Sequence, residues 1–242
     1  MILTVASAAA TTQLSSGDAP ATLIELYTSE GCSSCPPADR WLSALRDDPR
    51  LWREMVPVAF HVDYWDHIGW QDPYASAAHT ARQRAYHAKD RLSQVYTPGF
   101  IIGGREWRGF FTGDAAELSQ PPAVGRLHFE IFHAARAELR FTPVQSDAYP
   151  DDALRYTVAL LGFGLKSAVP RGENAGKELH HDFVVLGSSV GELTRSDAAF
   201  HAAVTMPSAQ QRAPRYGVAV WISRHGDPTP LQATGGWISG PP

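Results

Sequence analysis

A Cys-x-x-Cys segment lies between a strand-like run and a helix-like run near the start of the chain, and this arrangement sets narrow limits on the fold. Residues 22–28, Thr-Leu-Ile-Glu-Leu-Tyr-Thr, are apolar and β-branched, as in a buried strand. Residues 38–45 place their large apolar side chains on one face, as in an amphipathic helix. Cys32 and Cys35 are the only cysteines of the 242 residues. The sequence therefore predicts one cysteine pair at a strand-to-helix junction and no framework of structural disulfides.

Strand-like and helix-like segments continue to alternate through the first half of the chain. The expected elements are a strand at 56–64, a helix at 74–91, a hairpin at 101–111 and a short closing helix at 113–119. A succession of strand, helix, strand, helix, strand, strand and helix is typical of a small sheet covered by helices on both faces. We therefore predict an α/β thioredoxin-like domain over residues 21–120.

The second half of the chain consists of short strand-like runs separated by turn residues. Gln120, Pro121 and Pro122 interrupt the earlier pattern and mark the predicted domain boundary. The runs are residues 127–132, 137–141, 154–161, 181–186, 200–205, 217–222 and 231–237. So many strands with little helical periodicity are typical of an antiparallel β-sandwich resembling an immunoglobulin domain. We assign residues 123–242 to this second domain.

The first 20 residues are expected to be a disordered lead-in or the remnant of a signal peptide. Residues 1–10 are apolar and rich in alanine, but they lack the positive start of a complete export signal. The net charge of −4 argues against nucleic acid as a partner. No uncharged apolar run approaches the length of a membrane span, so we expect no membrane-spanning segment.

The position of the cysteine pair predicts redox chemistry. A thiolate at a helix N-terminus is stabilised by free backbone N–H groups and by the helix dipole. Cys32 is expected to be solvent-reachable and to attack a disulfide, and Cys35 to resolve the mixed intermediate. Ser33 and Ser34 carry hydroxyls that can hydrogen-bond a thiolate or cap the helix. Because Pro36 follows Cys35 directly, the helix is expected to begin at or after Pro36.

Three other interpretations of the pair stay open. A structural zinc site normally takes four Cys or His ligands, but the chain has no second Cys-x-x-Cys. His61 and His67 offer ligands that would complete a site for copper or another metal. An inert structural disulfide is the third, because the two-residue spacer alone does not guarantee turnover. We expect no metal and no cofactor beyond the dithiol itself.

Three further residues are predicted to support the cysteines. Thr97 and Pro98 precede the expected third strand, where thioredoxin-like folds place a cis-proline that faces the cysteines and holds the substrate peptide. The alternative is a trans proline that only starts a strand. Glu25, in the middle of the first strand, is a candidate to move the proton of Cys35; the alternative is a core glutamate satisfied by its neighbours.

Acidic and aromatic residues gather after the second strand. They are Asp63, Trp65, Asp66, His67 and Trp70. Strand ends are common ligand sites in α/β sheets, so this patch is predicted to form one wall of a substrate groove. The alternative is that both tryptophans pack beneath an inserted loop. Arg82 and Arg84 on the next helix are the expected partners of the two aspartates.

Five segments resemble one family of bacterial secreted proteins, domain-of-unknown-function family 1223. They are L-Y-T-S-E-G-C-S-S-C-P-P-A-D (26–39), V-D-Y-W-D-H-I-G-W-Q-D-P-Y-A-S (62–76), T-A-R-Q-R-A-Y (80–86), V-Y-T-P (95–98) and R-G-E-N-A-G (171–176). The resemblance implies a thioredoxin-like domain, a β-rich region and an export signal, with no agreed substrate. For residues 171–176 we consider a loop that docks the two domains or binds a partner, and a plain inter-strand loop with an Arg–Glu salt bridge.

These observations together predict a thiol–disulfide oxidoreductase of the cell envelope, periplasmic or secreted, acting on a protein thiol or disulfide client. The alternative is a non-catalytic binding or assembly protein whose cysteine pair is structural or receives a metal. The two differ in whether the reduced Cys32 thiol ionises more readily than a free cysteine.

Overall fold

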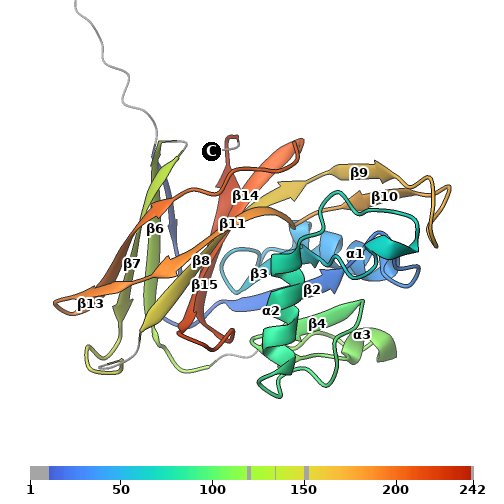
Figure 1. Cartoon of the computed structure of the whole chain (residues 1–242). Helices are drawn as coiled ribbons and strands as arrows, with labels where there is room; N and C mark the ends of the chain where they lie inside the picture. The colour runs from blue at the N-terminus through green and yellow to red at the C-terminus, as the bar shows by residue number, and fades with distance from the viewer. Residues whose placement is uncertain (1–10, 119–120, 134, 150–152, 241–242) are drawn as a thin grey trace, which may run out of the picture.

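The computed structural model describes residues 11–118, 121–133, 135–149 and 153–240 (Figure 1). The segment 1–10, proposed above as a signal remnant, lies outside these residues. The helices are α1 (Pro36–Ala44), α2 (Ala77–His87) and α3 (Gly109–Thr112). The strands of the first half are β1 (Thr12–Ser15), β2 (Thr22–Thr28), β3 (Met55–His61), β4 (Gly99–Ile102) and β5 (Arg105–Glu106). Those of the second half are β6 (Gly125–His133), β7 (Arg136–Pro143), β8 (Leu154–Phe163), β9 (Leu165–Ala168), β10 (Glu178–His181), β11 (Val184–Glu192), β12 (Thr194–Ser196), β13 (Ala199–Thr205), β14 (Arg215–Arg224) and β15 (Pro230–Ile238).

The predicted fold class, an α/β thioredoxin-like domain followed by an immunoglobulin-like sandwich, is wrong. Strands far outnumber helices in the described residues, and one eight-stranded sheet has the order β15-β14-β8-β11-β3-β2-β4-β5. Strands from both sides of the predicted boundary therefore share this sheet, while the division into domains itself stays a prediction. The join is made where β11 runs parallel to β3 and the N–H of Ala59 donates to the carbonyl of Phe183 at 2.9 Å. Local patterning showed both apolar strands but not that they pair with each other.

The antiparallel part of the molecule retains two packed sheets. The second sheet has five strands in the order β1-β6-β7-β13-β12. Its inward side chains, such as Phe129 and Phe141, share one core cluster with Val158 and Val220 of the eight-stranded sheet. Burial of this apolar surface holds the two sheets together.

The segment before β2 also differs from its prediction. Thr12–Ser15 form β1, which pairs antiparallel with β6 and places Leu14 opposite Phe129. Leu14 is buried in the core between the sheets, and this burial offsets the cost of ordering the strand. This part of the expected disordered lead-in is therefore a strand.

Two elements near β4 were assigned inaccurately. The second half of the predicted hairpin is only the two-residue β5. Helix α3 covers Gly109–Thr112, whereas residues 113–118 of the predicted closing helix are not helical. Trp107, expected in a strand, packs its ring on Phe100 and Trp41 at centroid distances of 5.4 and 5.3 Å. Aromatic packing at this corner thus replaces a longer strand pair.

Candidate functional site

The cysteine pair lies at the junction between β2 and α1. Cys32 and Cys35 form a disulfide with their Cα atoms 5.5 Å apart. Helix α1 begins at Pro36, which confirms the expected start. Pro36 and Pro37 have no N–H to donate, and the next two N–H groups both bond to the carbonyl of Cys35 at 2.8 and 3.1 Å. The helix therefore offers few free donors to a Cys32 thiolate.

Both cysteines are buried in this oxidised state. Cys32 is 1% exposed and Cys35 is fully buried, although Ser33 and Ser34 between them are exposed. The expectation that Cys32 is solvent-reachable is wrong for this conformation. The Sγ atom of Cys32 lies 3.3 Å from the hydroxyl of Ser34, so one of the two spacer hydroxyls does reach the sulfur.

The loop of residues 171–176, here called the capping loop, lies against the cysteine segment. Asn174 is fully buried, and its Nδ2 donates to the carbonyls of Glu30 at 2.8 Å and Cys32 at 3.0 Å. The carboxylate of Glu173 accepts from the N–H of Ser33 at 3.0 Å. The capping loop connects β9 to β10, and it docks on another part of the chain, as one of the two hypotheses for this segment proposed.

A second loop meets the cysteine segment with its tryptophans. The indole N–H of Trp65 donates to the hydroxyl of Thr97 at 2.7 Å. A Cβ atom at Gly31 would lie 2.9 Å from the Cβ of Trp65, so only glycine fits this close approach. Trp70 donates its indole N–H to the carboxylate of Glu30 at 2.7 Å. The peptide bond between Thr97 and Pro98 is cis, as predicted.

Five buried ionisable side chains form a network beside the disulfide. They are Glu30, Asp39, His61, Asp72 and His181. His61 Nδ1 lies 2.7 Å from the carboxylate of Asp72, and His181 Nε2 lies 3.0 Å from the carboxylate of Glu30. His181 Nδ1 lies 3.8 Å from Asp39 on α1. The N–H of Glu30 donates to Asp72 at 2.8 Å, which joins the two pairs.

Burial and charge move the pKa values within this network. Burial raises the pKa of Asp39, and the two histidines only partly oppose this effect. Burial alone would lower the pKa of His61, but the carboxylates of Asp72, Asp39 and Glu30 together outweigh it and raise that pKa to about 9. Asp39 lies four residues after Cys35, and residues at this spacing share one face of a helix. A carboxyl group that resists ionisation therefore lies one turn from the cysteine.

Sequence reasoning found only part of this network. Glu30 and Asp39 belong to the Cys-x-x-Cys segment but were not given a role, and His61 was considered only as a metal ligand. Asp72 and His181 gave no local signal, because only the fold brings them to the cysteines.

Glu25, predicted to move the proton of Cys35, has its partners on α2 and on its own strand, β2. Its buried carboxylate accepts two hydrogen bonds from Arg82, at 2.7 and 2.9 Å, and further bonds from Tyr27 and Tyr86. Side chains alternate along a strand, so Glu25 faces α2 while Thr28, three residues later, faces Asp39 on α1. The structure shows the alternative, a core glutamate satisfied by its neighbours, and Arg82 is not paired with the predicted aspartates.

The remaining acidic residues of the predicted patch are bound locally. Asp63 accepts from the hydroxyl of Thr80, and Asp66 accepts from the N–H of Asp72 at 3.2 Å. His67 is exposed, whereas His61 is buried against Asp72. Across the part of the chain that the structure describes, no three His, Cys, Asp or Glu side chains are grouped as metal ligands.

None of the helices described here is both long and apolar enough to cross a membrane.

Comparison with known proteins identifies a family and a fold. An X-ray crystal structure of a protein from Agrobacterium tumefaciens is 22% identical, with a TM-score of 0.59 over 88% of this chain and 92% of that one. HBP35 of Porphyromonas gingivalis is 13% identical, with a TM-score of 0.60 over 93% of this chain and 77% of that one. At these identities the likeness concerns the fold alone. A search of curated proteins gave no match. A family model matches residues 23–223, and the chain therefore belongs to the family described as protein of unknown function DUF1223.

Proposed function

We propose that Cys32 and Cys35 form a reversible redox disulfide and that the protein is a thiol–disulfide oxidoreductase of the cell envelope, periplasmic or secreted. One observation carries this proposal: the two cysteines of the chain are bonded to each other at the start of a helix, with a buried carboxyl group one turn further on. The client is a protein thiol or disulfide. No cofactor beyond the two cysteines takes part.

The exchange reaction transfers two electrons between the client and the Cys32–Cys35 pair and needs no other reactant. A client thiolate attacks the sulfur of Cys32, the bond between Cys32 and Cys35 breaks, and the electron pair leaves on Cys35, which takes up a proton. A second client thiol attacks the client sulfur of the mixed disulfide and releases the Cys32 thiol, leaving the client oxidised and the protein reduced. The reverse sequence reduces a client disulfide.

Asp39 is the proposed proton partner of Cys35 in this reaction. Its raised pKa keeps a proton available closer to neutral pH than an ordinary aspartate would. His181 lies 3.8 Å from Asp39 and also contacts the Glu30 carboxylate, so this imidazole can compensate the charge on Asp39 when Asp39 gives up its proton. Ser34 supplies a hydroxyl to the Cys32 thiolate once the disulfide opens.

The test is a titration of the two thiols in the reduced protein. Alkylation with iodoacetamide across pH, read by mass spectrometry of Cys32→Ser and Cys35→Ser variants, gives the pKa of each remaining thiol. We expect one thiol to have a pKa below the ~8.5 of a free cysteine, and we expect the disulfide to form and break reversibly in glutathione buffers. Two ordinary pKa values together with a disulfide that resists reduction would refute the proposal.

Burial of both sulfurs favours a second candidate, a binding or assembly protein with a structural disulfide. Structural disulfides of secreted proteins resist reduction by the glutathione pool, with potentials below about −300 mV. A measured reduction potential for Cys32–Cys35 below this value assigns the second function, and a higher potential assigns exchange. Cell fractionation of the tagged protein tests the proposed envelope location separately.

A further inference from the structure

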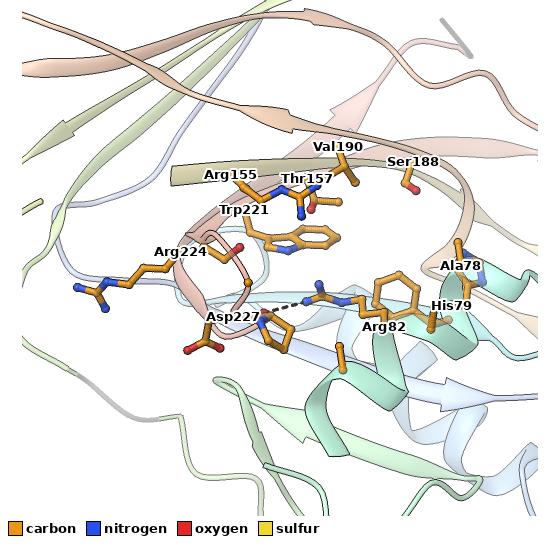
Figure 2. A pocket seen from close by; sticks show the side chains of 16 residues that line it. Ala78, His79, Arg82, Arg155, Thr157, Ser188, Val190, Trp221, Arg224 and Asp227 are labelled. Atoms are coloured by element: carbon orange, nitrogen blue, oxygen red, sulfur yellow. Dashed lines mark hydrogen bonds between the residues drawn. The ribbon is translucent and has the colours of Figure 1, made fainter. Parts of the chain in front are cut away.

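A pocket of about 490 Å³ opens on the α2 side of the eight-stranded sheet (Figure 2). Its floor is made by β8, β11 and β14, and helix α2 forms one wall. Since Glu25 faces α2 and Thr28 faces the cysteine helix, the pocket and the disulfide lie on opposite sides of this sheet. The exchange reaction proposed above makes no use of it, and its volume is in the usual range for small-molecule sites.

Positive charge dominates the polar lining. Arg82, Arg155 and Arg224 line the pocket together with a single carboxylate, that of Asp227. Arg82 is neutralised by Glu25 beneath it, and its guanidinium stacks 5.0 Å from the centroid of the Trp221 ring. Figure 2 shows Arg155 and Trp221 on the sheet with Arg82 facing them from α2.

Arg155 is the lining cation on which the inference rests. Among the described residues it forms no ion pair, and its Nε is buried with no hydrogen-bond acceptor. Glu192 is opposite Arg155 in the register of β8 and β11, but its carboxylate pairs with His225 at 3.3 Å. A half-buried guanidinium in this state is stabilised by an anion that offers a planar pair of oxygens.

The rest of the lining suits an apolar body attached to that anion. The methyl groups of three alanines on α2 contribute apolar surface, while Phe60 and Trp221 lie beneath it at 3% and 1% exposure. Val190, which is 52% exposed, adds a further apolar side chain to the lining. The hydroxyl of Thr157, two residues along β8 from Arg155, and that of Ser188 on β11 add polar groups to the lining. We infer that this pocket binds a small organic carboxylate with an apolar body, held by Arg155 and packed against the alanines of α2.

The binding test uses 3-phenylpropionate and its neutral amide as probes. Saturation-transfer NMR and the change in tryptophan fluorescence give the affinity of each probe for the intact oxidised protein. We expect 3-phenylpropionate to bind at least tenfold more tightly than the amide, because only the carboxylate pairs with Arg155. Equal affinity of acid and amide, or no binding of either at millimolar concentration, would overturn the assignment.

Variants locate the binding. Arg155→Gln should weaken 3-phenylpropionate at least tenfold, to the level of the amide, and Arg155→Lys should retain part of the affinity. Arg140→Gln is the matched control, since Arg140 is exposed on β7 of the other sheet. Unchanged affinity in Arg155→Gln, with a native circular-dichroism spectrum, contradicts the proposal. A peptide ending in phenylalanine that binds tenfold more tightly than the free acid would assign the site to a protein C-terminus instead.

Discussion

Asn174 should control how fast the disulfide can be reduced. Both sulfurs are buried, so a reductant reaches them only when part of the chain moves away. Asn174→Ala removes two hydrogen bonds to the carbonyls of Glu30 and Cys32. It leaves the Glu30 carbonyl without this donor, whereas the Cys32 carbonyl still accepts from the N–H of Cys35 at 3.2 Å. The unsatisfied carbonyl costs roughly 1 to 3 kcal/mol and the second lost hydrogen bond about 1 kcal/mol, so docking of the capping loop should weaken by about 2 to 4 kcal/mol.

This loss of docking free energy translates into a faster reduction rate if the reductant reaches the disulfide only when the capping loop opens. Every ~1.4 kcal/mol is a factor of ten in the open population, so the expected acceleration is roughly 30-fold to several hundredfold. The assay is the rate of reduction by dithiothreitol at pH 7 under native conditions, quenched with an alkylating agent and read by mass spectrometry. The free energy of global unfolding is measured in parallel by urea denaturation.

Gln232→Ala is the matched control. Gln232 is also a fully buried amide, and its Nε2 donates to the carbonyl of Gly125 at 2.7 Å while its Oε1 accepts from Ala21 at 3.1 Å. It should lower global stability by a similar amount without speeding reduction of the disulfide. If Asn174→Ala reduces at the wild-type rate, or only as fast as Gln232→Ala, the capping loop does not gate the cysteines and the reasoning fails.

Three further predictions follow from the buried charges. Glu25→Gln leaves the Arg82 guanidinium buried without its carboxylate, so the free energy of unfolding in urea should fall by about 3 to 5 kcal/mol. The rate at which the disulfide is reduced in the native protein should not change, because Glu25 faces the other side of the sheet. The pKa of His61, raised to about 9 from 6.5, means that its pair with Asp72 stabilises the fold fully below pH 6.5 and that this contribution is lost as pH rises through about 9; urea denaturation should show this decline, and His61→Gln should remove it. Burial raises the pKa of Asp39, so ionisation of this group lowers stability above the unfolded value near 3.8. The stability of Asp39→Asn minus that of the wild type should therefore be more favourable at pH 8 than at pH 4, and the variant should exchange disulfides more slowly. An equal stability difference at both pH values would contradict the assignment.

Local patterns predicted most individual elements because each depends on neighbouring residues. The apolar run at 22–28 became β2, and Pro36 began α1 as expected. The sheet could not be predicted in the same way. Apolar strands such as β3 and β11 carry no information on which partner they take, and their pairing across more than 120 residues changed the fold class.

For the candidate site too, the sequence predicted contacts between neighbouring residues but not those that depend on the fold. The cysteine pair and the cis bond before Pro98 were predictable from residues adjacent in sequence. The choice between Glu25 and Asp39 was available in principle, because strand alternation places positions 25 and 28 on opposite faces, but it required knowing which face α1 covers.

The capping loop explains why a short motif far from the cysteines belongs to the same site. Gly172 and Gly176 have positive φ values of 79° each, so both ends of the loop use backbone that glycine adopts without strain. This geometry turns Asn174 inward to two carbonyls of the cysteine segment, a contact across more than 140 residues. The buried amide would be costly if the loop only connected two strands. Its placement is what the gating predicted for Asn174 requires, since the hydrogen bonds that close the loop are made to the segment that carries Cys32.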